Sequence, residues 1–132
     1  MAMDIPNIRK RQSKEHIEQV KFVLWVRVFH PELICAAVPN GADVSAAQRI
    51  RLVKEGMLAG FPDLILMGAS KSVLLLEFKR PTVKGSAKGV VSQEQLELHR
   101  RLSDAGFDVQ VVSSLDEAKK AVLAWIGGID GR

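Results

Sequence analysis

The sequence has only one cysteine and no long apolar run. These two features argue against a fold held by disulfides and against a membrane-spanning protein. Cys35 is the only cysteine among 132 residues, which excludes an internal disulfide and predicts a small buried hydrophobe in a protein of the reducing cytosol. No stretch approaches the roughly 20 apolar residues of a membrane span. The first residues also lack the apolar segment of a signal peptide, so we expect no membrane partner.

The composition predicts one globular domain, because 47% of the residues are hydrophobic and 26% are charged. The net charge of +4 is too modest to identify a polyanionic partner by itself. The basic residues, however, gather in three groups: Arg9, Lys10, Arg11 and Lys14; Arg49, Arg51 and Lys54; Lys79, Arg80, Lys84 and Lys88. A basic loop is usually only solvated, but beside a metal site it would also bind backbone phosphates.

Capping residues and turn residues predict the element order α-β-α-β-β-α-β-α. We expect helices over residues 13–29, 45–55, 92–105 and 114–126, and strands over residues 33–38, 63–67, 73–79 and 107–112. Ser92 with Gln95, and Ser114 with Glu117, fit capping boxes. A short link makes the second and third strands an antiparallel pair, and a crossover helix makes the third and fourth parallel. The expected α/β fold is a mixed four-stranded sheet flanked by helices.

Apolar patterning also predicts burial and domain limits. The second half of the first helix is apolar nearly all round, which is typical of a deeply buried helix. The strand over residues 33–38 is also predicted to be buried. We expect a mobile basic leader over residues 1–12, one domain over residues 13–126, and a loose tail over residues 127–132.

Three side chains are expected to meet at one edge of the sheet. Because side chains alternate along a strand, Glu77 and Lys79 share a face at the end of an apolar strand. Counting back from the hairpin turn places Asp63 opposite Glu77. Two facing carboxylates repel unless a cation lies between them, and Mg²⁺ binds through one or two carboxylates plus water and phosphate oxygens. The alternative is an ordinary solvent-exposed ion pair.

The spacing of Pro62-Asp63 and Glu77-Phe78-Lys79 resembles the PD-(D/E)XK nuclease signature, with glutamate as the second acid. The flanking sequence resembles the virus-type replication-repair nuclease (VRR-NUC) branch, in particular its small, stand-alone, phage-type members. The segments that carry this resemblance are 37–41, 56–66, 75–80 and 92–95, together with Trp25. The resemblance extends over residues 13–126, and its one departure is Phe61 in place of the commoner valine.

The resemblance implies a restriction-endonuclease-like core and a metal-dependent phosphodiesterase. Asp63 and Glu77 would bind Mg²⁺ or Mn²⁺, and Lys79 would assist the attacking water. The backbone carbonyl of Phe78 would be a further ligand. A glutamate of the first helix would complete the site: Glu15, which has the family's spacing to Gln19, is preferred, with Glu18 as the alternative. Either residue could instead be an exposed first-turn glutamate.

The same resemblance suggests residues that contact DNA or support the acids. Gln95 would reach the site from the helix after the lysine, unless its role is only to cap that helix. His99 follows one turn later and could contact a phosphate, although a lone histidine on a helix is more often solvated or satisfied within the core. Asn40 could touch substrate, and the basic loop would contribute Arg80, Lys84 and Lys88. His16 and His30 show no ligand-like spacing.

These features predict a DNA endonuclease that selects branched, flapped or four-way DNA in replication, repair or recombination. A chain of 132 residues has little room for a separate recognition module, so we expect a homodimer that presents two sites. The alternatives are a non-catalytic nucleic-acid-binding relative and an interaction domain of the same fold. The preferred DNA structure and the choice between endonuclease and exonuclease action stay open.

Overall fold

The computed structural model describes residues 14–39, 44–79 and 91–130, and the predicted order of elements is confirmed within them. The expectations for residues 1–13, 40–41, 80–90 and 131–132 lie outside the described residues. The elements are α2 (Lys14–Phe29), β1 (Ile34–Ala37), α3 (Ala46–Lys54), β2 (Leu64–Met67), a short 3-10 turn (Ala69–Lys71), β3 (Val73–Phe78), α4 (Gln93–Asp104), β4 (Asp108–Val112) and α5 (Leu115–Asp130).

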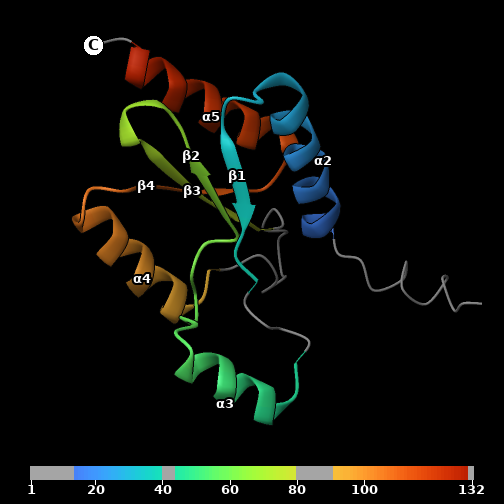
Figure 1. Cartoon of the computed structure of the whole chain (residues 1–132), viewed down its shortest axis with the longest axis vertical. Coiled ribbons are helices and arrows are strands. Elements are labelled where there is room, and N and C mark those ends of the chain that lie inside the picture. Colours follow the sequence, from blue (N-terminus) through green and yellow to red (C-terminus); the bar gives the residue numbers. More distant parts are fainter. Residues whose placement is uncertain (1–13, 40–43, 80–90, 131–132) are drawn as a thin grey trace, which may run out of the picture.

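The four strands form one mixed sheet in the order β1-β2-β3-β4. β2 pairs antiparallel with both β1 and β3, whereas β3 and β4 are parallel and are joined through α4. In the hairpin, Leu64 pairs with Leu76 and Met67 with Val73. The predicted antiparallel hairpin and parallel crossover are therefore confirmed (Figure 1).

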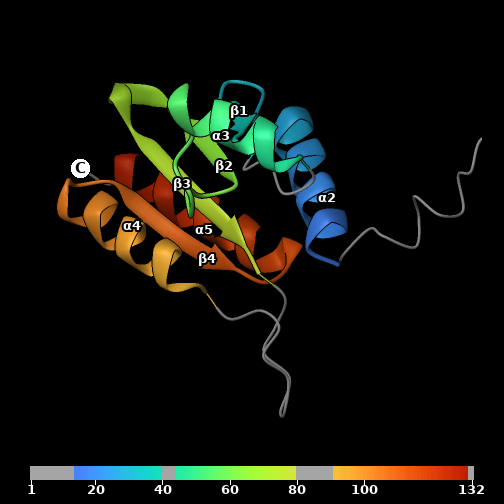
Figure 2. The same ribbon diagram turned by 90° about the horizontal axis from the view of Figure 1, so that it is seen from below.

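Helices α2 and α5 cover one face of the sheet, and α4 lies on the other side of β4 (Figure 2). The alternate residues of β2 and β3 fill the core beneath α2 and α5: Leu64, Leu66, Leu74, Leu76 and Phe78. They pack against side chains of both helices: Phe22, Val26, Ala118, Val122 and Trp125. Each of the large side chains stabilises the fold by roughly 1.5–3 kcal/mol through burial. Within the described ranges, no helix is long and apolar enough to cross a membrane.

Two expectations about burial are wrong. The outer face of α2 is open to solvent, with Leu24 59% and Val28 67% exposed, because no described segment packs on that side. Strand β1 lies at the edge of the sheet, and Ile34 is 60% exposed there. Cys35 is only half-buried and packs against the core.

The start and end of α5 also differ from expectation. Ser114 caps the helix as predicted, but the carboxylate of Glu117 accepts a hydrogen bond from the backbone of Ser113 rather than from Ser114. The helix continues past Ile126 to Asp130, so residues 127–130 are helical rather than a loose tail. By contrast, the capping boxes of α3 at Ser45 and of α4 at Ser92 are complete.

Gly60 allows the connector before β2 to approach the first turn of α4 closely. Its φ angle is +83°, and a Cβ atom there would lie 2.8 Å from the backbone nitrogen of Gln95 and 2.9 Å from the carbonyl carbon of Glu94. Both the backbone conformation and the close approach favour glycine. This contact fixes the start of α4 against the chain that leads into β2.

We expect Gly60→Ala to lower the free energy of unfolding by at least about 2 kcal/mol, because left-handed strain of about 1–2 kcal/mol is added to a backbone clash. Gly106→Ala is the matched control, since Gly106 has a φ angle of +97° and nothing within 4 Å of a built Cβ. The free energy of unfolding of Gly106→Ala should fall only by the cost of the left-handed strain. Urea unfolding of both variants measures the difference, and equal losses would contradict the close contact.

Candidate active site

Asp63 directly precedes β2, and backbone contacts with both neighbouring strands hold it in place. The hairpin register, extended by one residue beyond the pair Leu64–Leu76, places Asp63 opposite Glu77 as predicted. Its carboxylate Oδ2 accepts a hydrogen bond of 2.8 Å from the backbone N–H of Phe78. Its carbonyl oxygen accepts another of 2.8 Å from the N–H of Val38. The orientation of the carboxylate therefore follows from the pairing of the sheet.

The side chain of Glu77 is only 3% exposed, although it carries a carboxylate. Its Oε2 accepts a hydrogen bond of 3.1 Å from Gln95 Nε2 and lies 3.7 Å from Lys79 Nζ. Its Oε1 is buried and accepts no hydrogen bond from any residue in the described part of the chain. The alternative of a solvent-exposed ion pair is therefore wrong, and one acceptor atom of the site is left without a donor.

The electrostatics of the two acids reflect this burial. Loss of solvation raises the pKa of Glu77 to about 8, and the nearby charge of Asp63 adds to the rise. Lys79 and Gln95 oppose the shift but do not cancel it. Burial also raises the pKa of Asp63, while the N–H of Phe78 lowers it. Without a cation, the pair therefore retains a proton at neutral pH.

Gln95 performs both of the roles considered for it. Its side-chain Oε1 accepts a hydrogen bond of 3.0 Å from the N–H of Ser92 and completes the capping box of α4. Its Nε2 donates to Glu77 at 3.1 Å. An amide can do both because its oxygen accepts while its nitrogen donates. The same turn that starts α4 therefore also orients the buried carboxylate.

His99 lies on α4 one turn after Gln95 and belongs to the same neighbourhood. Its Nε2 is buried and forms no hydrogen bond with the residues that the structure describes. Burial lowers the pKa of His99, and the charge of Lys79 lowers it further, whereas Asp63 raises it. The ring is thus close enough to Lys79 and Asp63 for their charges to change its pKa. It was expected at the site as a phosphate contact, and that role stays a prediction.

The structure separates the two candidate glutamates of α2. The carboxylate of Glu18 accepts a hydrogen bond of 2.7 Å from the N–H of Leu115 and so holds the start of α5. Glu15 is close enough for its charge to raise the pKa of Asp63. Glu15 is therefore the better candidate for the site. The role of Glu18 at α5 depends on a contact 97 residues away, which no local pattern signals.

The donor set suits a hard divalent cation bound partly through water. Among the described side chains, no group of three or more histidines, cysteines or acids is arranged to hold a metal ion. Asp63 and Glu77 nevertheless supply two carboxylates. Mg²⁺ typically binds through one or two carboxylates, and water and phosphate oxygens complete its octahedron. The unpartnered Oε1 of Glu77 fits a cation, because a buried acceptor needs a partner.

The profile of the VRR-NUC domain matches residues 4–116. The chain belongs to the VRR-NUC family. It is similar to a solved structure described as a VRR_NUC domain protein, with 18% identity, a TM-score of 0.64, and coverage of 88% of this chain and 90% of that chain. A second solved VRR_NUC domain has 19% identity and a TM-score of 0.53, with coverage of 84% and 96%. No curated protein sequence matches the chain.

Membership of the VRR-NUC family confirms the resemblance, and the solved relatives confirm the mixed α/β fold. It also implies a nuclease-type domain. Four of the residues expected to contact DNA, namely Asn40, Arg80, Lys84 and Lys88, lie outside the described residues. The backbone carbonyl of Phe78 as a metal ligand stays a prediction. What the sequence did not predict is the N–H of Phe78 as the group that fixes Asp63, although the hairpin register contains that information.

The raised pKa of Glu77 predicts how the metal-free VRR-NUC domain responds to pH. The ordinary pKa of 4.5 rises to about 8 on folding, so the folded state binds more protons than the unfolded state between these values. The free energy of unfolding therefore falls as the pH rises through this window. We expect the Tm in EDTA to be lower at pH 8.5 than at pH 5.5 by about 5 °C or more, the shift that one to two kcal/mol produces at this size.

Glu77→Gln is the control, because a glutamine mimics the protonated acid without titrating. Its Tm should change less with pH than that of the unsubstituted protein. Addition of Mn²⁺ at pH 8.5 should recover the Tm of the unsubstituted protein by about 3 °C, since a bound ligand stabilises the folded state, and should leave Glu77→Gln nearly unchanged. The same pH dependence in both proteins would contradict a raised pKa at Glu77.

Proposed function

We propose that this protein is an endonuclease that hydrolyses phosphodiester bonds of DNA and depends on Mg²⁺ or Mn²⁺. The observation that supports this most strongly is the pair of half-buried Asp63 and buried Glu77, with an unpartnered Oε1 on Glu77 and Lys79 beside it. Two acids held in this way destabilise the fold unless a proton or a cation neutralises them. A structural role alone gives no reason to retain them.

Each residue at the site then has a distinct task. Asp63 and Glu77 would hold the metal ion, together with the backbone carbonyl of Phe78, and Glu15 would complete the site from α2. The metal would lower the pKa of a bound water and offset charge on the phosphate. Lys79 exchanges its contact with Glu77 for one with the attacking water or the phosphate. Gln95 keeps Glu77 in place throughout.

We propose branched, flapped or four-way DNA as the substrate, in replication, repair or recombination within the cytosol of a bacterial or phage-infected cell. The basic residues of α3 and of residues 80–90 would bind the phosphate backbone, and Asn40 and His99 would add contacts with the DNA. Phosphate contacts position DNA without reading its sequence. Selection would therefore depend on the shape of the DNA.

A cleavage panel of linear, flapped and four-way DNA with Mn²⁺ or Mg²⁺ tests this proposal. We expect Lys79→Ala to lower kcat by roughly 10²–10³-fold, because it removes a charge that stabilises the transition state. Asp63→Asn should abolish cleavage and also the binding of Mn²⁺. Lys71→Ala is the matched control, since Lys71 is an exposed lysine in the hairpin turn at the other end of the strands.

Full activity of Lys79→Ala would contradict its proposed role. DNA binding without any metal-dependent cleavage by the unsubstituted protein would overturn the nuclease proposal in favour of a non-catalytic nucleic-acid-binding domain.

We also propose that two copies of the chain associate through α2. This helix is apolar on opposite sides: Phe22 and Val26 are buried in the core, whereas an outer stripe is exposed and consists of Ile17, Val20, Leu24 and Val28. A helix that is hydrophobic all round is typical of burial on both sides. A two-fold pairing of this stripe with its copy would cover it and would place two sites on one DNA.

Leu24→Asp should convert the dimer into a monomer, because like charges would face each other across the two-fold axis. Sedimentation equilibrium measures the mass of each form. Paired cuts in four-way DNA should fall by at least about tenfold, the loss that 1.4 kcal/mol produces, while cutting of flapped DNA persists. Leu96→Asp on α4, where the leucine is similarly exposed, is the control. A monomeric unsubstituted protein would refute the association.

A further inference from the structure

An apolar cleft of about 440 Å³ lies between α3, the connector before β2 and the edge of the sheet. This volume is in the range of ligand pockets, roughly 300–1,000 Å³. The apolar side chains that line it come from the segment after β1, from α3, from the connector and from β2: Val38, Pro39, Leu52, Met57, Leu58, Phe61 and Ile65. Glu55 is the one charged lining residue, and it already pairs with Arg51 at 3.1 Å. The cleft therefore presents apolar surface without a free acid that would repel a polyanion.

The cleft lies on the same face of the sheet as the candidate active site. Side chains alternate along β2, so Leu64 and Leu66 enter the core while Ile65 points to the opposite face. Asp63 precedes Ile65 by two residues and shares that face with Glu77, which faces Gln95 on α4. Two residues along a strand span roughly 7 Å. The apolar lining therefore begins beside the carboxylate pair.

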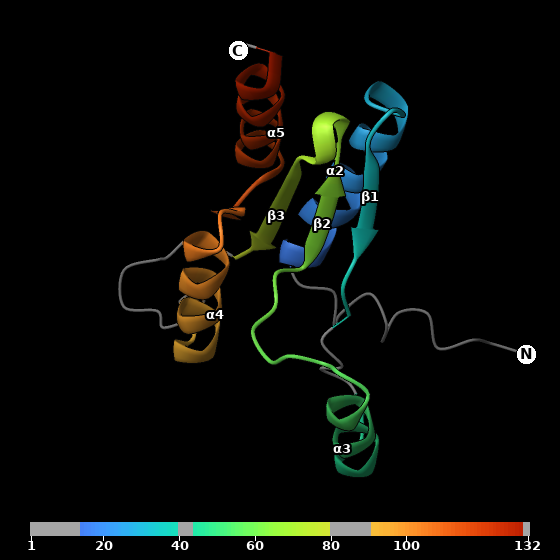
Figure 3. The same cartoon turned by 60° about the vertical axis from the view of Figure 1, so that its left-hand side comes forward.

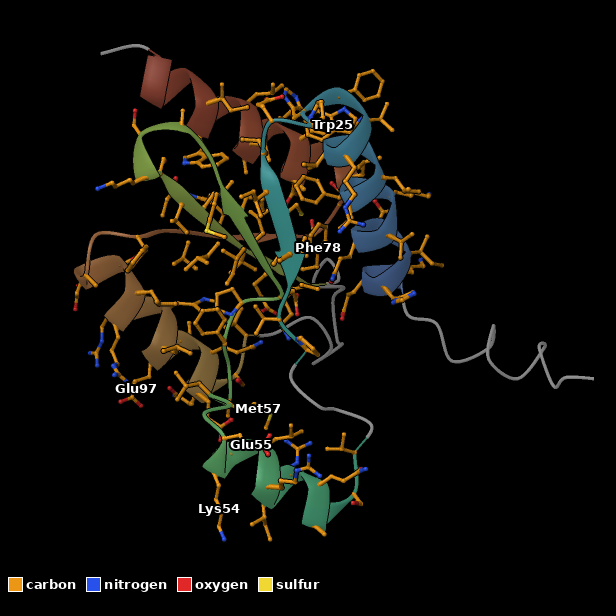
Figure 4. All side chains as sticks on the ribbon, viewed as in Figure 1. Trp25, Lys54, Glu55, Met57, Phe78 and Glu97 are labelled. Carbon is orange, nitrogen blue, oxygen red and sulfur yellow. The ribbon has the colours of Figure 1, made fainter. Side chains whose placement is uncertain are left out.

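Helix α3 forms the outer wall of this cleft but buries none of its own residues. It stands apart from the layers of the sheet in two views (Figures 1 and 3). Lys54 extends away from the body at the end of α3, whereas Glu55 and Met57 lie at the junction with the connector (Figure 4). Arg49 adds to the positive charge of the helix, whereas the charge of Arg51 is balanced by Glu55. A basic helix above an apolar cleft suits a ligand with both a phosphate and an apolar ring.

We propose that this cleft holds one unpaired nucleobase of the DNA strand that is cut at the carboxylate pair. The proposal rests on the proposed nuclease function and deepens it, because it gives a reason for flapped DNA, which carries unpaired nucleotides, to be preferred over a fully paired linear duplex. Bases stacked in a duplex cannot enter a cleft, whereas an unpaired base exposes its ring faces to apolar and aromatic side chains such as Phe61. The phosphates on either side of the base would lie between α3 and the site.

Binding of flapped DNA that carries a single abasic residue tests the cleft without cleavage. The abasic residue is placed in turn at each of the first three unpaired positions, and affinity is measured by anisotropy in the Lys79→Ala background with Ca²⁺. At one position, loss of the base should weaken binding roughly tenfold, as is typical of one stacked base. Leu58→Ser should weaken binding of the intact flap by a similar factor and should make the protein insensitive to the abasic residue.

Leu58 is 52% exposed, so its replacement should not unfold the protein, and Met57→Ser serves as a second cleft variant. Leu123→Ser is the matched control, because that leucine is 54% exposed on α5, away from the lining. It should retain the abasic sensitivity. Equal binding of intact and abasic flaps, unchanged sensitivity in both cleft variants, or no binding of flapped DNA would each overturn the proposal.

The binding readout separates this inference from the proposed nuclease function. Absence of metal-dependent cleavage by the unsubstituted protein would refute the nuclease function, whatever the ratio of its affinities for intact and abasic flapped DNA. Cleavage with no abasic effect would refute only the nucleobase cleft.

Discussion

The buried carboxylate of Glu77 is the constraint on which the rest of the site depends. An ionised group that is 3% exposed is strongly destabilised unless its charge is balanced and its oxygens have donors. Lys79 and Gln95 meet part of this need at Oε2, whereas Oε1 has no donor among the described residues. Either a proton, as the raised pKa indicates, or a cation completes the balance. The metal-free protein is thus less stable than a variant with an apolar residue at position 77 would be. This loss of stability is the expected trade-off of a site that is built to bind a cation.

The sequence predicted the parts of this arrangement that depend on local chemistry. Serine caps and glycine breaks define helix ends within a few residues, so α3 and α4 begin where they were expected. The hairpin register follows from counting back from the short turn, and it alone brings Asp63 opposite Glu77. The capping box of Ser92 and Gln95 was also predicted from the sequence. The second contact of its side chain, with Glu77 18 residues earlier, required only that α4 pack over the end of β3.

Features that depend on distant packing could not be predicted in the same way. An apolar residue on α2 is compatible with a core or with a partner, and the pattern around Leu24 does not distinguish the two. The apolar composition of β1 suggested a buried strand, but the strand order places it at an edge of the sheet. Glu18 could have been a ligand by its spacing alone; only the position of α5 shows that it caps Leu115. In each case the missing information is the identity of a neighbour far along the chain.

The alternation of one strand pair explains why the site and the core can coexist in so small a sheet. On one face, the even-numbered residues of β2 and β3 are four leucines and Phe78 beneath α2 and α5, and their packing sets the position of the strands. On the other face, Asp63 and Glu77 emerge with that position already fixed. The close contact of Gly60 with α4 ties this second face to the helix that carries Gln95. Side chains aimed by a packed backbone need little reorganisation to bind a cation, so the chemistry of this face is supported by the leucines of the other.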